Sequence, residues 1–365
     1  MKKNAFIPTF GNRPIPLVGR DEILADFMEG LKHPEGHPNR ATFFMGQRGT
    51  GKTALLLEIS ARAEKKGYVV ALVTAKEKML DDILQILRIK GEKHINAKQQ
   101  VKGVSAGAFG FSLGLSFTED VQQNYGFRIK LTMIADELAK HKKGVLILVD
   151  EVLSKTPEMR ELAVTYQHLV GEGKNIAIAM AGLPAAVSSV LHDDILTFLN
   201  RAKKVDLGPL ALNDISLFYS GRFIEEKKKI SADTLDFVVK STLGYPYLMQ
   251  LIGYNILKYA GESETIEHRI AETAVINAKR DLTDSIHKTC LRPLSDQDRA
   301  FLKAMSMDTE SSRIIDLQTR MNVSAAYIQQ YRTRLVAAGV ILSEQRGRVE
   351  FAVPYLGEYL RGELD

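Results

Sequence analysis

The 365-residue sequence contains one cysteine, Cys290, and no long hydrophobic run. A single thiol excludes an internal disulfide framework and a cysteine-rich zinc module, and it suits a reducing compartment. No segment approaches the roughly 18 consecutive apolar residues that a membrane span needs. Lys2 and Lys3 are followed by no apolar stretch before Pro8, as a secretory leader would require. We therefore expect a soluble, cytoplasmic protein that does not associate with membranes.

Metal-binding histidine pairs and low-complexity segments are also missing. His33 and His37 are four residues apart, but each precedes a proline, which favours a loop over a helical ligand pair. With 27 glycines, 11 prolines, 45% hydrophobic and 25% charged residues, the composition is that of an ordinary globular protein. The net charge of +5 permits contact with nucleic acid without requiring it. At roughly 150 residues per domain, the length predicts two or three domains.

Short apolar runs alternate with helical patterns in the first two hundred residues. The predicted strands are residues 41–45, 68–74, 145–149 and 176–181, and the predicted helices are 53–66, 81–87, 127–142 and one that begins at Thr156-Pro157. In the third of these helices we expect Ile129, Met133, Ile134 and Leu138 to share one face. This alternation predicts a doubly wound parallel α/β domain over about residues 15–205. A glycine-rich stretch, residues 102–117, interrupts it and is expected to form a β-hairpin or a flexible insertion.

Strand patterns largely disappear after Pro209. Helical spacing covers residues 213–226, 231–241, 246–260 and 265–288, with a lysine run at 227–229 that we expect to be a solvated loop. Next come three shorter helical stretches (295–305, 313–321 and 324–338) and two β-like runs that flank residues 345–348. This order of elements is typical of a winged helix-turn-helix. The predicted fold class is α/β, with a core at residues 1–205, a helical domain at 206–292 and a winged helix at 293–365.

Residues 46–53 match the P-loop (Walker A) pattern G-x-x-x-x-G-K-[ST] at every fixed position. The eight residues are Gly46, Gln47, Arg48, Gly49, Thr50, Gly51, Lys52 and Thr53. Glycines let backbone N–H groups turn toward phosphate oxygens at a helix N-terminus. Lys52 would reach the β- and γ-phosphates, and the Thr53 hydroxyl would hold Mg²⁺. Because the motif follows a predicted strand and opens a predicted helix, it predicts a nucleoside-phosphate site.

An acidic pair, Asp150-Glu151, ends the strand predicted at residues 145–149. A carboxylate at the tip of a neighbouring strand suits Mg²⁺, and a second can orient the attacking water. Alone, such a pair fits a solvated turn or a helix start equally well. Together with Lys52 and Thr53 it predicts a Walker B position, in which Asp150 holds Mg²⁺ and Glu151 is catalytic. GTP is disfavoured, since no N-K-x-D guanine-binding motif follows a later strand.

These features resemble AAA+ ATPases of the origin-recognition type and the related signal-transduction (STAND) NTPases. The segment at residues 17–24 resembles the box that packs on adenine in these proteins. The likeness extends over most of residues 15–260. It includes the P-loop, the acidic pair, a strand ending in Gly182-Leu183-Pro184 and the tetrapeptide Gly244-Tyr245-Pro246-Tyr247. The resemblance implies a P-loop ATPase core, a helical lid over residues 206–292 and a C-terminal winged helix, with ATP/ADP and Mg²⁺ as cofactors.

The resemblance also assigns roles to individual residues. Val18, Gly19 and Arg20 would line the adenine side, and Pro246 would contact the nucleotide and link the lid to its state. Arg201 falls where this group places an arginine finger, which usually acts from a neighbouring subunit and implies a homo-oligomer. A surface arginine that ends a helix beside Lys203 and Lys204 explains Arg201 equally well.

Two departures from the AAA+ pattern predict a slow enzyme. Met180-Ala181-Gly182 offers no polar sensor at the end of its strand, and the lid presents Gly244-Tyr245-Pro246 instead of an arginine. We therefore expect an ATPase switch governed by whether ATP or ADP is bound. The alternative is a DNA-binding regulator or a protein adaptor in which the nucleotide is structural and hydrolysis negligible.

The charge of the C-terminal module gives conflicting indications about DNA binding. Residues 295–365 contain nine lysines and arginines against ten acidic residues, a poor electrostatic footprint. Basic residues nevertheless cluster on the expected reading helix and wing: Arg320, Arg332, Arg334, Arg346 and Arg348, beside Tyr327, Gln329 and Gln330. Arg332, Arg334, Arg346 and Arg348 are therefore the predicted contacts to duplex DNA. The alternatives are a docking module with ordinary surface arginines, or one that binds a protein client.

Overall fold

The computed structural model describes residues 4–9, 17–152 except 101–124, 156–193, 196–343 and 345–363; for residues 94–100 it describes the backbone only. The glycine-rich stretch at 102–117 thus lies outside the described residues. Within the described ranges, no helix is both long and apolar enough to cross a membrane.

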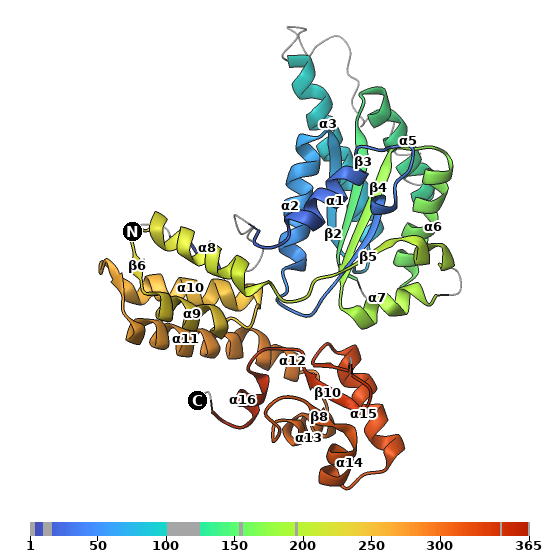
Figure 1. Ribbon diagram of the computed structural model, residues 1–365. Coiled ribbons are helices and arrows are strands. Elements are labelled where there is room, and N and C mark those ends of the chain that lie inside the picture. The colour runs from blue at the N-terminus through green and yellow to red at the C-terminus, as the bar shows by residue number, and fades with distance from the viewer. Residues whose placement is uncertain are drawn as a thin grey trace.

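The first two hundred residues form a parallel sheet that carries helices on both faces (Figure 1). The strands are β1 (Ala41–Met45), β2 (Tyr68–Thr74), β3 (Gly144–Val152), β4 (Ile176–Gly182) and β5 (Lys203–Asp206). Their order in the sheet is β2-β3-β4-β1-β5, and every neighbouring pair is parallel. The helices are α1 (Asp21–Gly30), η1 (Pro38–Arg40), α2 (Lys52–Lys65), α3 (Met79–Gln100), α5 (Phe127–Lys140), α6 (Pro157–Gly171), α7 (Pro184–Leu191) and η2 (Thr197–Arg201).

The two faces of the sheet bury separate hydrophobic clusters because successive side chains of a strand point in opposite directions. Phe44 packs with α1 and α2 on one face, whereas Phe43 packs with α3, α5, α6 and α7 on the other. Both rings are almost completely buried. The doubly wound core predicted from the alternating pattern is confirmed.

A helical domain follows the sheet. It contains α8 (Leu212–Glu225), α9 (Ala232–Ser241), α10 (Pro246–Ala260), α11 (His268–Leu282), the π-helical turn η3 (Thr283–His287) and α12 (Lys288–Leu291), with the two-residue strands β6 (Lys229–Ile230) and β7 (Thr265–Ile266) pairing at one end. Ser231 caps α9 by accepting a hydrogen bond from the Thr234 backbone N–H.

The C-terminal module consists of short helices and a small antiparallel sheet. Its elements are α13 (Asp296–Met305), β8 (Ser312–Arg313), α14 (Ile314–Met321), α15 (Ala325–Ala337), β9 (Ile341–Leu342), β10 (Arg348–Phe351) and α16 (Leu356–Leu360). The sheet order is β8-β10-β9. The three predicted helices and the two β-like runs are present, whereas β8 and α16 have no counterpart in the sequence prediction.

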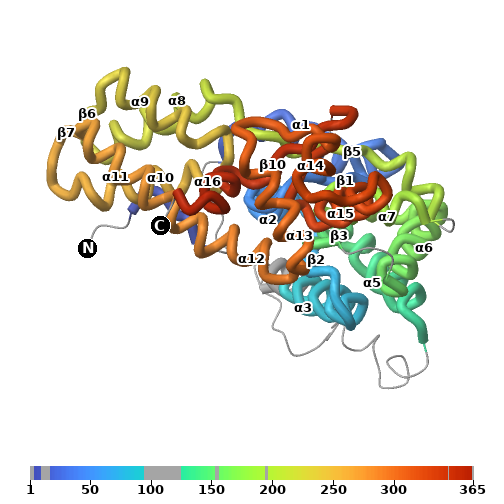
Figure 2. The backbone as a smooth tube through the Cα atoms, turned by 90° about the horizontal axis from the view of Figure 1, so that it is seen from below, coloured from blue at the N-terminus to red at the C-terminus, as the bar shows by residue number. Residues whose placement is uncertain are grey.

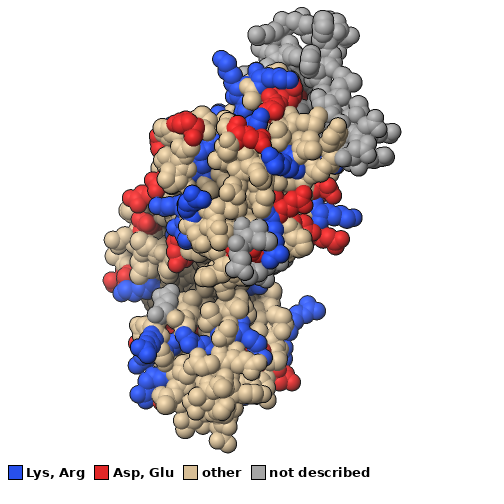
Figure 3. Space-filling view, turned by 90° about the vertical axis from the view of Figure 1, so that its right-hand side faces the viewer, with Lys and Arg blue, Asp and Glu red and all other residues tan. Residues whose placement is uncertain are grey.

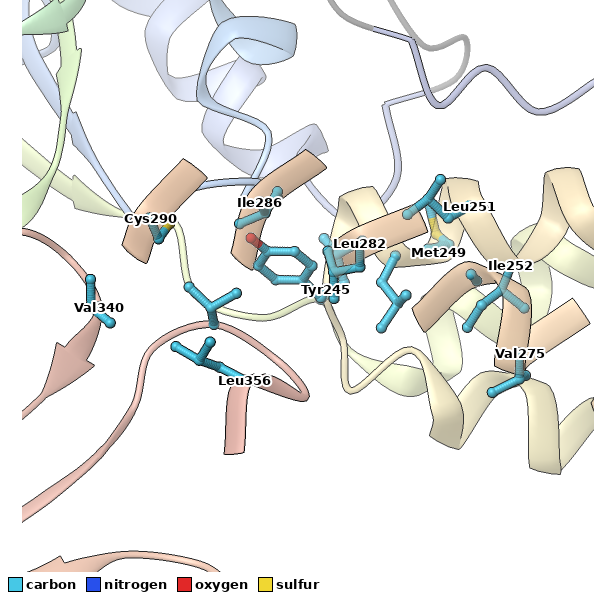
Figure 4. Packing of buried hydrophobic residues seen from close by; sticks show 14 of the residues in the cluster. Tyr245, Met249, Leu251, Ile252, Val275, Leu282, Ile286, Cys290, Val340 and Leu356 are labelled. Atoms are coloured by element: carbon cyan, nitrogen blue, oxygen red, sulfur yellow. The ribbon is translucent and has the colours of Figure 1, made fainter. Parts of the chain in front are cut away.

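The helical domain and the C-terminal module bury a single, continuous hydrophobic cluster. Figure 4 shows Tyr245, Ile286 and Cys290 of the helical domain on one side of it, with Val340 and Leu356 of the C-terminal module facing them. Viewed from below, α12 and α16 lie where the two parts meet (Figure 2). Helix α15 of the module also contacts α7 of the core.

Four local predictions were wrong. The helix predicted at 81–87 runs from Met79 to Gln100, since residues after Leu87 keep good helix propensity although their apolar pattern ends. Ile129 is 47% exposed because the buried stripe of α5 follows Leu131, Ile134, Ala135 and Leu138 instead. The helix predicted at 265–288 begins only at His268, after the short strand β7, and it continues to Leu291 through a π turn and α12. The lysine run is not simply solvated: Lys228 donates hydrogen bonds to the carbonyls of Gly261 and Ser263, and β6 includes Lys229.

Candidate functional site

A cavity of about 280 Å³ lies at the carboxyl edge of the sheet, beneath the helical domain. Ligand sites of open parallel sheets occur at this edge. Eleven of the residues predicted for the site line it: Val18, Arg20, Arg48, Gly49, Thr50, Gly51, Lys52, Thr53, Asp150, Glu151 and Pro246. The structure thus brings together segments that are widely separated in the sequence.

Asp150 is held in place by two hydrogen bonds. Its Oδ2 accepts one from the Thr53 hydroxyl at 2.6 Å, and its Oδ1 accepts another from the Glu151 backbone N–H at 2.9 Å. Asp150 is buried, whereas Glu151 is exposed. The backbone φ of Glu151 is 54°, and the register of β3 against β4 shifts between Val149 and Val152. A non-glycine residue in the left-handed region costs energy and often marks a functional position.

The Lys52 ammonium is packed inside the P-loop. Its Nζ donates hydrogen bonds to the carbonyls of Gly46 at 2.8 Å and Gln47 at 2.7 Å. Burial lowers the pKa of Lys52 to about 8, although the charges of Asp150 and Glu151 oppose that shift. A cation held in this way lies where it can bind an anion that enters the P-loop.

The lid tetrapeptide contacts the P-loop directly. The Tyr245 hydroxyl donates a hydrogen bond to the Arg48 carbonyl, and the Tyr247 backbone N–H donates one to the Gly49 carbonyl at 3.3 Å. Gly49 has a φ of 78°, and a Cβ there would lie 2.3 Å from the Tyr245 hydroxyl oxygen. Glycine is therefore required at position 49 by the lid as well as by the backbone.

Val18, which the family resemblance assigns to the base, shares the lining of the cavity with the apolar side chains of Leu17, Leu210 and Met249. The Arg20 guanidinium is buried and donates a hydrogen bond to the Gly208 carbonyl at 2.5 Å, so it braces the connection between the sheet and the helical domain.

Four predicted residues do not line the cavity. Gly19 faces Leu210 and Asp214, and Gly46 is packed against Thr50 and Leu207. Gln47 turns toward the C-terminal module, where a Cβ at Gly339 would lie 2.9 Å from its Oε1 atom. The fourth, Arg201, immediately precedes β5, which is parallel to β1, so it lies at the amino edge of the sheet, opposite the P-loop.

Three of the four arginines predicted to contact DNA are engaged within their own module. Arg332 donates hydrogen bonds to the Ser343 hydroxyl, and Arg348 to the Ser311 hydroxyl. Arg334 forms a salt bridge to Asp298 at 2.6 Å and lies over the Tyr331 ring. Arg346 is exposed in the turn before β10. Figure 3 shows lysine and arginine side chains gathered on one face of this module, with few acidic ones beside them.

Sequence reasoning missed two groups of cavity residues. Ile7, Pro8 and Thr9 contribute a wall from the N-terminal segment, while Ser285, Ile286 and Thr289 contribute one from the π turn and α12. No local pattern distinguishes the second group, since their spacing suits any helix. Gln250 and Tyr247 also line the cavity, and the latter belongs to the tetrapeptide noted in the sequence.

Comparisons with known proteins identify the fold of this chain. Residues 284–360 match the model of a family described as a domain of unknown function (DUF8462). No curated protein matches the sequence. Among solved structures, the chain is similar to a Walker-type ATPase of Pyrococcus abyssi, with 15% identity, a TM-score of 0.69 and coverage of 96% of this chain and 97% of that one.

Two further solved structures are similar over almost the whole chain. The ORC2 protein of Aeropyrum pernix, solved as ADPNP–ADP complexes, has 14% identity and a TM-score of 0.62, covering 98% of this chain and 96% of its own. Cdc6p of Pyrobaculum aerophilum has 15% identity and a TM-score of 0.52, with the same coverages. The chain therefore has the fold of origin-recognition-like AAA+ ATPases, with a parallel-sheet P-loop core and a helical C-terminal region.

The lowered pKa of Lys52 predicts that nucleotide affinity depends on pH. Only the charged ammonium attracts phosphate, so affinity should be constant well below pH 8 and fall as the pH rises through about 8. The loss should approach about tenfold per pH unit until the pKa of the complex is reached. Titration with a fluorescent ADP analogue measures this loss of affinity. The titration is repeated at pH values from about 6.5 to about 9.5, which bracket the Lys52 pKa of about 8. Lys52→Arg, which cannot deprotonate, should bind with a flat pH profile; a parallel decline in this variant contradicts the assignment.

The hydroxyl of Tyr245 should matter to both stability and binding. Tyr245→Phe removes the hydrogen bond to the Arg48 carbonyl, at a cost of about 1 kcal/mol in the free energy of unfolding. ADP affinity should fall several-fold, since the P-loop loses its link to the lid. Tyr247→Phe is the matched control because Tyr247 contacts the P-loop through its backbone. Equal effects of the two substitutions on melting temperature and on the dissociation constant of ADP would refute this role.

Proposed function

We propose that this protein is an ATP-binding, slowly hydrolysing switch ATPase. The observation that carries the proposal is the single cavity in which the P-loop, the Asp150-Glu151 pair and Pro246 of the lid meet. Helix α2 begins at Lys52, so its N-terminus and the preceding amides face the same space. This combination suits a nucleoside triphosphate whose phosphates lie in the P-loop and whose base lies against the apolar side chains of the lining.

The residues present fit a magnesium ion. The Thr53 hydroxyl and the Asp150 carboxylate are adjacent oxygen donors in the cavity, which is the donor set that Mg²⁺ shares with nucleotide phosphates. When bound, the ion would neutralise charge that develops on the phosphates. Lys52 would bind the β- and γ-phosphates, and Glu151, exposed and lining the cavity, would accept a proton from the attacking water.

Slow hydrolysis is inferred from the groups around the phosphate end. Among the residues that line the described cavity, the cations are Arg20, Arg48 and Lys52, and Arg20 is committed to the Gly208 carbonyl. The lid contributes Pro246 and Tyr247 rather than an arginine. Arg201, at the opposite edge of the sheet, could reach a phosphate only in another subunit, so its catalytic role requires a homo-oligomer.

The π turn is the element that we expect to relay the nucleotide state. Ser285 and Ile286 line the cavity, whereas the adjacent His287 is fully buried and its Nε2 donates to the Pro354 carbonyl of the C-terminal module at 2.8 Å. Short π-helical segments often occur at functional sites. Lys279–Glu358, at 2.8 Å, ties the same helical run to α16. A change in the packing of Ile286 would therefore move the module.

We infer that the C-terminal module is a winged helix that contacts duplex DNA or a protein client. The first half of α15, with Tyr327, Gln329 and Gln330, is exposed, as the start of a recognition helix must be. The turn containing Arg346 occupies the position of the wing. Arg332, Arg334 and Arg348 are paired within the module, so less positive charge is available to bind DNA phosphates. A protein client is therefore the second candidate partner of the module.

Hydrolysis should depend on Glu151. Glu151→Gln should lower the single-turnover rate by at least about a hundredfold while ATP still binds, because the general base is lost. Glu158→Gln, at the start of α6 and outside the residues that line the cavity, should hydrolyse ATP normally. Turnover by the wild type above about ten per second without a partner contradicts the slow switch. No measurable hydrolysis by the wild type favours the alternative in which the nucleotide is structural.

DNA contact should depend on Arg346 more than on the other arginines. Arg346→Ala should weaken duplex binding and reduce the slope of log affinity against log salt by about one, as for one lost phosphate contact. Lys303→Ala, exposed on α13, is the control. The quadruple exchange of Arg332, Arg334, Arg346 and Arg348 to Glu should abolish binding. Binding that is unaffected by all of these changes, or absent at low salt in the wild type, points to a protein client.

A further inference from the structure

Residues 4–9 form a strap that is anchored on the helical domain. The Phe6 side chain is 1% exposed, and its ring packs edge-on against Phe218 and Tyr219 of α8 at centroid distances of 5.7 Å. On the other side it fits against Gly253 of α10, where a Cβ would lie 2.3 Å from the ring. Glycine at this position leaves the space that the ring occupies, so Phe6 has a specific pocket.

Hydrogen bonds hold the strap on either side of this anchor. The Ile7 backbone N–H donates to Oε1 of Gln250 at 3.0 Å, and the Asn4 side chain donates to the Tyr254 carbonyl at 3.2 Å. Both partners belong to α10 of the helical domain. The strap therefore follows the lid and not the sheet.

The other end of the strap belongs to the candidate nucleotide site. Ile7, Pro8 and Thr9 line the cavity, and so does Gln250, which binds the strap. Leu17, which packs with the hydrophobic cluster of the P-loop core, also lines the cavity. Val18 lines it too but packs against the cluster of the helical domain. The cavity is thus lined both by the strap, which is attached to the helical domain, and by Leu17, which is attached to the core.

We propose that the strap retains bound nucleotide, and that the seating of Phe6 controls how fast the nucleotide leaves. This inference rests on the proposed nucleotide-binding function. A base that is enclosed between the strap and Leu17 would leave past the strap when Phe6 leaves its pocket or when the helical domain and the strap move away together. Phe6 is accordingly a positioning residue that acts through the cavity wall.

Release of a fluorescent ADP analogue, chased by excess ADP, tests the inference on the full chain. Phe6→Ala should accelerate release by about tenfold and change the association rate much less, because affinity differences at one site appear mainly in dissociation. Gly253→Ala, which fills the Phe6 pocket from the lid, should accelerate release similarly. Phe237→Ala is the matched control, since this ring packs against His268 on the same domain. Unchanged release in folded Phe6→Ala protein overturns the inference.

A second measurement leaves the anchor intact. Thr9 is exposed and lines the cavity, while the native Cys290 is buried, so a maleimide should react selectively with Thr9→Cys protein. Saturating ADP should slow this reaction at least about fivefold by covering the side chain. An unchanged rate in protein that binds ADP contradicts the strap while sparing the proposed function. Wild-type protein that binds no nucleotide refutes the proposed function itself, and the strap with it.

Discussion

The hydrogen bonds from the lid tetrapeptide to the P-loop are the interaction on which the organisation of this molecule depends. Tyr245 and Tyr247 reach the carbonyls of Arg48 and Gly49, which belong to the loop whose amides would face phosphates. These hydrogen bonds join the helical domain to the loop without an intermediate element. The requirement for glycine at position 49 comes from this close approach as much as from its positive φ.

The described residues pack as two bodies. The sheet buries its own clusters on its two faces, whereas the helical domain and the C-terminal module share one. The segment between these bodies is held at both ends, by Leu207 N–H to the Met45 carbonyl and by Leu210 N–H to the Gly244 carbonyl. Closely packed interiors transmit displacement, so the lid and the module are expected to move together relative to the sheet. The cavity lined by the P-loop lies where the two bodies meet.

Most of the core and much of the site could be predicted because their signals are local. Val145 to Val149 and Ile176 to Ala181 are continuous apolar runs, which is what a strand buried on both faces requires. The P-loop residues are consecutive, so their roles follow from one pattern. Helix α3 was less predictable, because it continues beyond Leu87 on helix propensity alone after its apolar pattern ends. The π turn between α11 and α12 was also less predictable, because no proline or side-chain cap marks it.

The sequence by itself determined the elements whose chemistry is contained in neighbouring residues: the P-loop, the acidic end of β3 and the glycine-tyrosine-proline segment. Only the tertiary structure decided which of their side chains face the cavity, turning Gln47 away toward Gly339 and pairing Arg334 with Asp298. It also brought Phe6 to α8 and Ile286 to the P-loop region. Such contacts join residues that are far apart in the chain. Hydrophobic periodicity indicates which face of an element is buried, but it does not indicate which other element covers that face.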